Sequence, residues 1–193
     1  MGDPKKQRKK YETPRFRWRK DTLQEELKLL GQYGLRNKHE LRRHKTMLSK
    51  TRGIARSLIG KTPEERTKME NELLTSLKKL AILAETAVLD NVLDLSIEDL
   101  LERRLQTIVF RKGLTRTIFQ SRQLITHGHV NIGNRRVTVP GYIVSKEEEN
   151  QVAYSPQSTL ANETHPLRLS LTIVAKQPEI KPPPRGRRGG RRF

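Results

Sequence analysis

The feature that most constrains this chain is the stretch 103–136, which contains eight arginines and lysines and no aspartate or glutamate. A solvated protein surface usually mixes the two signs, because like charges repel one another in a compact state. A fold that contains this stretch must either tolerate that repulsion or expose these positive charges to a polyanion. Nucleic acid is the obvious polyanion, since each neutralised phosphate releases a condensed counterion.

The rest of the chain also carries its charge in blocks. The total is +19, from 40 basic and 21 acidic residues. Both tails are basic and an acidic helical block lies between two basic ones, and an anionic membrane surface and histone-like DNA binding stay open as alternatives to RNA. The blocks are 1–20 (+7), 21–61 (+6), 62–102 (−6), 103–136 (+8), 137–180 (−2) and 181–193 (+6).

Composition excludes several classes of protein. There is no cysteine, so disulfides and thiolate metal sites are excluded, and this fits a reducing cytoplasm. The longest apolar run, 80–84, is far below the roughly 18 residues that span a bilayer, and the charged N-terminus has no signal-peptide pattern. Hydrophobic residues make up 33% of the chain, a low share that predicts segments which order only on a partner.

Motifs for catalysis are missing from the sequence. There is no glycine-rich phosphate loop, zinc-binding pattern or nucleophile elbow. His127 and His129 form a conceivable metal pair, but no carboxylate or thiol stands near them in the sequence. We therefore expect no cofactor, no metal and no enzymatic activity.

The N-terminal half reads as helical. Capping patterns at Asp21 and Asn37 predict helices that run to about Leu30 and Leu58, and Thr62 followed by Pro63 predicts a third helix start. The second of these helices places its basic residues within an arc beside the apolar face. We interpret this basic stripe as a phosphate-contacting edge rather than a solvated face; its residues are Lys38, Arg42, Lys45, Arg52 and Arg56.

The first 20 residues have no apolar periodicity and predict an extended arm. Three aromatic residues, Tyr11, Phe16 and Trp18, are interleaved with arginines in this short segment. Arginine binds phosphate, and an aromatic ring can stack on a base or fill a hydrophobic pocket. A disordered tail with incidental aromatics is the alternative. The arm residues expected to contact RNA are Arg15, Arg17 and Arg19.

The C-terminal half changes periodicity. One helix is expected from Ser96 to Gly113 and a second from a cap at Thr115 to Gly128, with Phe119 facing inward. After Gly128 the period becomes about two, which predicts short strands and makes the protein α+β. The expected strands are 129–132, 135–139, 142–145, 151–154 and 167–175, with a turn at Gly133 and Asn134 and a charged loop at 146–150.

A helix–turn–helix–strand unit over 96–145 thus carries the one-sided charge. Arginine suits phosphate because its fork is planar and bidentate, and glutamine, asparagine and histidine can reach sugar hydroxyls and base edges. An internal ion pair to Asp99 or Glu102 is the alternative for the first two arginines. The expected RNA-contacting residues are Arg103, Arg104, Arg111, Lys112, Arg116, Arg122, Gln123, His127, His129, Asn131, Asn134, Arg135 and Arg136.

Three segments carry a resemblance to a known family. The run LERRLQTIVFRKG, the residues 116–132 and the residues 134–144 resemble the RNA-binding domain of the small-subunit ribosomal protein S-four family. The N-terminal segment 11–45 is similar to the archaeal and eukaryotic branch of that family. The resemblance covers about residues 8–155 and leaves the tail 181–193 outside it.

The resemblance implies a function and a set of neighbours. Members are primary binders of small-subunit ribosomal RNA, bind a junction in its 5′ domain and nucleate assembly of the subunit body in the cytoplasm. They neighbour ribosomal proteins five and three near the channel through which messenger RNA enters, and influence decoding accuracy. Some bacterial members have a cysteine zinc site, which this chain lacks.

The same small domain also occurs in enzymes, such as pseudouridine synthases, tyrosyl-tRNA synthetases and RNA methyltransferases, and in stress proteins that bind free subunits. Residues 137–193 are too few for a catalytic domain, and the matching N-terminal half speaks against the stress protein. We therefore predict five parts. They are a basic arm (1–20), a helical domain (21–95), an RNA-binding domain (96–155), a return segment packed on the helical domain (156–180) and a basic Pro/Gly/Arg tail (181–193).

Overall fold

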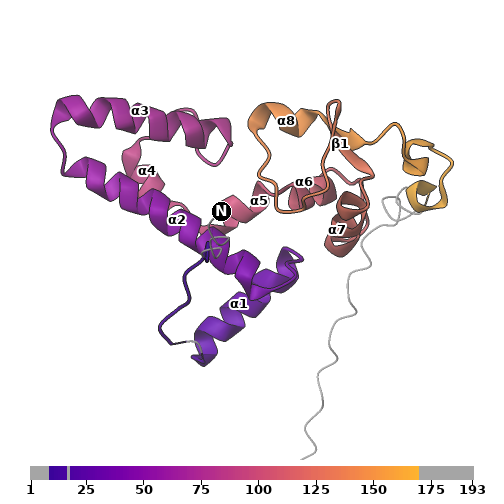
Figure 1. Cartoon of the computed structure of the whole chain (residues 1–193), viewed down its shortest axis with the longest axis horizontal. Helices are drawn as coiled ribbons and strands as arrows, with labels where there is room; N and C mark the ends of the chain where they lie inside the picture. The colour runs from indigo at the N-terminus through magenta and orange to yellow at the C-terminus, as the bar shows by residue number, and fades with distance from the viewer. Residues whose placement is uncertain (1–8, 17, 170–193) are drawn as a thin grey trace, which may run out of the picture.

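The computed structural model describes residues 9–16 and 18–169, and in it a helical part lies beside a smaller part built on a short sheet (Figure 1). The helix α5 leads from the one into the other. The elements in chain order are α1 (Lys20–Gln32), α2 (Lys38–Ile59), α3 (Pro63–Lys79), α4 (Leu89–Asp94), α5 (Ile97–Glu102), α6 (Leu105–Arg111), α7 (Ile118–Thr126), β1 (Val130–Ile132), β2 (Arg135–Arg136), α8 (Lys146–Asn150), β3 (Val152–Tyr154) and a 3-10 turn (Thr159–Ala161).

The long helix α2 organises the helical part, since α1, α3, α4 and α5 all pack on it. The predicted cap at Asn37 is confirmed, because its Oδ1 accepts a hydrogen bond from the Glu40 backbone N–H at 3.0 Å. Its apolar face is also confirmed. Leu41, Leu48 and Leu58 are buried along it, against α4, α5 and the end of α3.

The sheet part has a core of its own. Strands β2, β1 and β3 form an antiparallel sheet in that order, with Asn131 opposite both Arg136 and Ala153. The turn predicted between β1 and β2 is confirmed, and Gly133 takes a positive φ of 56° there. Leu105, Ile125 and Val130 lie at the centre of the core that α6, α7 and the sheet enclose.

The single helix expected from Ser96 to Gly113 is in fact two helices. The Ser96 cap is confirmed, but the chain becomes extended at Arg104, where φ is −71° and ψ is 140°. Arg104 pairs there with Ile143 in an isolated bridge, and the Leu105 backbone N–H donates to the Tyr142 carbonyl at 2.8 Å. Backbone hydrogen bonds to residues far along the chain thus replace a helical turn. No local sequence pattern indicates this break.

Other boundaries also differ from expectation. The first helix begins at Lys20 without the Asp21 cap, and α7 is capped by Thr117, because Thr115 is buried and bonded to Ser121. The strands expected at 135–139 and 142–145 reduce to β2 and the bridge at Ile143. The loop expected at 146–150 is the helix α8, whose N-terminus is capped by the side chain of Ser145.

The described part of the return segment, 156–169, packs on the sheet part rather than on the helical part. Leu160 is buried in the core around the sheet, and the Ser158 hydroxyl lies 2.8 Å from Nδ1 of His129. Residues 167–169, expected to begin a strand, lie in a helical turn instead. The rest of that expected strand, 170–175, and the tail 181–193 lie outside the described residues.

Candidate nucleic-acid interface

The helix α7 turns a mainly polar face to solvent because its apolar residues, apart from Phe119, are used for packing. Ile118 meets the backbone at Gly34, while Leu124 and Ile125 enter the sheet core. Thr117 caps its N-terminus by accepting from the Gln120 backbone N–H at 3.2 Å. The outward residues one turn apart are Phe119, Gln123 and Thr126, with Arg116 just before the helix and His127 just after it.

The hairpin brings a second arginine to the end of α7. Arg136 on β2 donates from Nη2 to the carbonyl oxygen of His127 at 3.0 Å. The intervening Gly128 has a φ of 77°, and a Cβ there would lie only 2.0 Å from the Arg136 guanidinium. Glycine is therefore needed at this position both for the backbone and for the approach of Arg136.

These residues form one exposed surface, which we call the α7 surface: Arg116, Phe119, Gln123, His127 and Arg136. Neither of its arginines has a carboxylate within ion-pair distance among the described residues. Phe119 is 60% exposed, although the sequence pattern predicted it inward. Helical phase relative to Leu124 and Ile125 would have placed it outward, so a usable signal was present.

Two expected contact residues turn inward to a carboxylate of the helical part. Glu40 on α2 accepts from Arg104 Nη2 at 3.1 Å and from Arg122 Nη2 at 2.8 Å. We call these three residues the Glu40 cluster. The side chain of Arg104 is 1% exposed, so its expected RNA contact is wrong; Arg122 remains partly exposed.

The Glu40 cluster has a defined charge state. Burial raises the pKa of Glu40, but the hydrogen bonds from Arg122 and the charge of Arg104 outweigh it, so the pKa lies below its ordinary value. Next to it, burial and then the Arg104 guanidinium lower the pKa of His44 to about 4. Near pH 7 the Glu40 cluster therefore holds a carboxylate and two guanidiniums, and the imidazole of His44 beside it is neutral.

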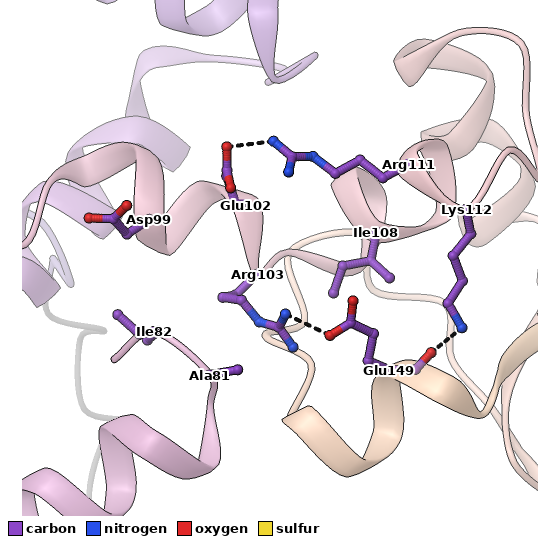
Figure 2. A pocket seen from close by; sticks show the side chains of 9 residues that line it. All are labelled: Ala81, Ile82, Asp99, Glu102, Arg103, Ile108, Arg111, Lys112 and Glu149. Atoms are coloured by element: carbon purple, nitrogen blue, oxygen red, sulfur yellow. Dashed lines mark hydrogen bonds and ion pairs between the residues drawn. The ribbon is translucent and has the colours of Figure 1, made fainter. Parts of the chain in front are cut away.

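A second group of expected contact residues lines a pocket of about 310 Å³ between α5, α6 and α8 (Figure 2). Arg103 Nη1 binds the Glu149 carboxylate at 2.7 Å, Arg111 pairs with Glu102, and Lys112 donates to the carbonyl of Glu149. Three cations face three carboxylates here, counting Asp99, so the pocket has no net charge. Arg111 and Lys112 are exposed all the same and stay predicted RNA contacts.

The basic stripe of α2 is largely turned to protein. Glu26 of α1, with a side chain only 5% exposed, lies 3.3 Å from Lys38, 3.8 Å from Arg42 and 3.7 Å from Lys45. Arg52 donates to the carbonyl of Leu95. Arg42 and Arg52 are half-buried and hold α1 and the end of α4 to α2, so these two residues of the stripe are engaged with protein. Lys45 and Arg56 stay exposed.

The remaining expected residues divide between surface and interior. Asn131 is buried in the middle strand, which excludes its expected RNA contact. His129 is partly buried against Ser158. Asn134 and Arg135 are exposed at the hairpin turn, where Arg135 lies 4.0 Å from Glu148.

The described part of the arm lies against α2. Tyr11 stacks on His39 with ring centroids 4.8 Å apart, and the Glu12 backbone N–H donates to Thr46 Oγ1 at 2.9 Å. Farther along, Trp18 is 89% exposed and Phe16 is exposed as well. The neighbouring Arg15 and Arg19 are exposed, while Arg17 lies outside the described residues.

Within residues 9–16 and 18–169, no three histidine or acidic side chains come together in a way that would hold a metal ion. A search of the same residues for a helix with the length and apolar character of a membrane span finds none.

Comparison with known proteins gives two results. Residues 103–150 match the S4 domain family. The chain is also similar over most of its length to archaeal proteins named small ribosomal subunit protein uS4. It is 53% identical to that of Hyperthermus butylicus over 161 residues (83% of this chain, 92% of the relative) and 46% identical to that of Thermoplasma acidophilum over 180 residues (92% and 90%). It is 53% identical to that of Saccharolobus solfataricus over 155 residues (80% and 86%).

Proposed function

The chain belongs to the uS4 family of small ribosomal subunit proteins, and from this we propose that it is a structural, RNA-binding constituent of the small ribosomal subunit in the cytoplasm. The observation that carries the proposal is the α7 surface. Its arginines lack carboxylate partners among the described residues, and the surface lies within the matched S4 domain. Exposed arginines without a carboxylate partner suit phosphate.

A structural role is favoured over an enzymatic one. The relatives are matched over about nine tenths of their own length, and each is named as a protein of the small ribosomal subunit. The mechanism is scaffolding, in which phosphate contacts supply affinity and the fixed shape of the protein selects a folded RNA.

We further infer, from the family resemblance, that the RNA is a multi-helix junction in the 5′ domain and that binding nucleates assembly of the subunit body. The Glu40 cluster supports this role, because it joins α2 to α6 and α7 through charge-assisted hydrogen bonds. Two parts that are held at a fixed angle can fix the angle between two RNA helices. Contacts with ribosomal proteins five and three, and an influence on decoding near the messenger channel, belong to the same proposal.

Footprinting of the purified full chain on its own small-subunit ribosomal RNA, without other proteins and at two salt concentrations, tests the proposal. We expect protection confined to one junction that survives the higher salt. Arg116→Gln is expected to lower the slope of log affinity against log salt by about 0.7 to 0.9. Diffuse protection that disappears at the higher salt would rule out the role as a primary, assembly-nucleating binder.

A further inference from the structure

A second basic site lies at the seam between the helical part and the sheet part. A cavity of about 360 Å³ opens there between α2 and the segment after β2, and we call it the seam pocket. Arg43 and Met47 line it from α2, Arg122 from α7, and Val139 and Pro140 from the segment after β2. It therefore combines guanidinium groups with an apolar wall.

The charges in the seam pocket do not balance. Arg43, Arg104 and Arg122 line it with a single carboxylate, that of Glu40, and the imidazole of His44 is neutral near pH 7. Two positive charges therefore remain uncompensated. Burial lowers the pKa of Arg104, the charge and hydrogen bonding of Glu40 raise it, and the positive charges of Arg122 and Arg43 lower it.

Hydrogen-bond donors are also in excess around the pocket. Arg104 Nη1 lies 3.4 Å from His44 Nε2. Because arginine can only donate, Nε2 must accept, and the proton of the neutral imidazole then lies on Nδ1. Neither that Nδ1 nor Arg104 Nε has a hydrogen-bond partner among the described residues. Both nitrogens are closed to solvent, so the accessible donors of the pocket are those of Arg43 and Arg122.

We propose that the seam pocket binds one nucleotide of the RNA, with its phosphate on Arg43 and Arg122 and its sugar or base against Val139, Pro140 and Met47. This rests on the proposed RNA-binding function and gives it a discrete subsite. The volume lies in the range of small-ligand pockets, about 300 to 1,000 Å³, and a bare phosphate would leave much of it unfilled.

The position of the pocket favours RNA over an acidic protein segment as the occupant. Arg122 lies on the same helix as the α7 surface, next in sequence to Gln123, so one RNA strand can pass from that surface into the pocket. Val139 is exposed and follows the hairpin that carries Arg136. The pocket is thus continuous with the proposed interface.

The first test removes the accessible charge. Arg43 is exposed and no carboxylate among the described residues pairs with it, so Arg43→Gln should leave the fold intact. With the full chain and its own small-subunit ribosomal RNA, we expect on the order of tenfold weaker binding and a salt slope reduced by about 0.7 to 0.9. Lys68→Gln, an equal charge loss on the exposed face of α3, is the control and should change neither. An unchanged Kd and slope for Arg43→Gln would overturn the proposal.

The second test fills the pocket without changing its charge. Gly141 lines the pocket, and an added Cβ meets only Arg104 Nη2 at 3.8 Å, an ordinary contact. The backbone therefore accommodates a Cβ at this position, and a wild-type circular dichroism spectrum of Gly141→Leu shows that the longer side chain leaves the fold intact. We expect this variant to bind RNA on the order of tenfold more weakly. Gly31→Leu, where nothing lies within 4 Å of the added Cβ, is the steric control. Wild-type affinity in a folded Gly141→Leu protein would contradict a nucleotide in the pocket.

Phosphate ethylation interference on the RNA separates this proposal from the proposed function and does not depend on how Gly141→Leu folds. We expect one phosphate whose ethylation weakens binding of the wild-type protein but not of Arg43→Gln. If Arg116→Gln weakens binding and Arg43→Gln shows the wild-type interference pattern, the subsite is wrong while the α7 surface stands. If neither Arg116→Gln nor Arg43→Gln alters binding to the RNA, both the subsite and the proposed RNA interface are wrong.

Discussion

At the scale of single residues, Glu40 decides how several basic side chains are used. Its backbone N–H is taken by the helix cap at Asn37, and its carboxylate binds Arg104 and Arg122, which lie 64 and 82 positions away in the chain. Removal of one partner from a buried ion pair leaves an uncompensated charge, which costs more than the pair itself contributes. Glu40 is therefore the residue whose loss should weaken the contact between the helical part and the sheet part most.

We expect Glu40→Gln to lower the free energy of unfolding by about 3 kcal/mol, because Arg104 stays buried without a counter-charge. Urea unfolding followed by circular dichroism measures this. Glu72→Gln, an exposed acidic residue of α3, loses the same charge and should change stability by less than about 0.5 kcal/mol. Equal small effects of the two substitutions would mean that the Glu40 cluster does not contribute to stability.

The histidine beside this cluster predicts a pH dependence. Burial and the charge of Arg104 lower the pKa of His44 from 6.5 to about 4, so the unfolded chain binds a proton there before the folded chain does. Stability from His44 is complete above pH 6.5 and falls, by on the order of 3 kcal/mol, as the pH drops to about 4. His44→Gln should flatten the stability profile over this interval, as measured by urea unfolding at a series of pH values, and an unchanged profile would contradict the prediction.

At the scale of elements, α2 holds its neighbours with ionic contacts as well as with leucines. Glu26 brings α1 against α2 through Lys38, Arg42 and Lys45, each within 4 Å. The arm then crosses the same helix, with Glu12 bonded to Thr46. Cations that would otherwise repel one another along one edge of α2 are thus grouped around one buried carboxylate.

Glu26→Gln should release α1 from α2. Without the carboxylate, three cations remain close together and their repulsion opposes docking. We expect amide hydrogen exchange in 20–32 to accelerate on the order of tenfold or more, corresponding to a loss of at least about 1.4 kcal/mol, while the sheet part exchanges as in the wild type. Mass spectrometry of peptides from both parts makes the comparison within one sample, and unchanged exchange in α1 would contradict the prediction.

At the scale of the whole molecule, the 40 basic residues exceed the 21 acidic ones by 19, so even complete one-to-one pairing would leave 19 cations without a carboxylate. Where the helical part meets the sheet part, the carboxylate of Glu40 is already paired with arginines. The α7 surface and the seam pocket therefore keep an excess of positive charge. Self-repulsion of this kind destabilises the compact state in the absence of a polyanion.

The free protein should therefore become more stable as salt screens that repulsion. We expect Tm to rise by a few degrees between low and physiological ionic strength, where the Debye length falls from about 30 to 8 Å. Phosphate should raise Tm more than chloride does at equal ionic strength, because it also binds arginine. A Tm that falls with salt would show that internal ion pairs outweigh the repulsion.

Local and compositional signals in the sequence determined much of this protein. The caps at Asn37 and Ser96, the turn at Gly133 and the change of period after Gly128 depend on neighbouring residues, and the structure confirms them. The acid-free block 103–136 and the family resemblance likewise indicated RNA from the sequence alone.

Tertiary structure alone decided which basic side chains are exposed and which are paired inside the protein. Arg104, Arg42 and Arg52 read as surface cations, yet their partners lie on other elements, and a charge in the sequence does not reveal a distant counter-charge. The break between α5 and α6 has the same origin, because its backbone partners, Tyr142 and Ile143, are brought there only by the fold.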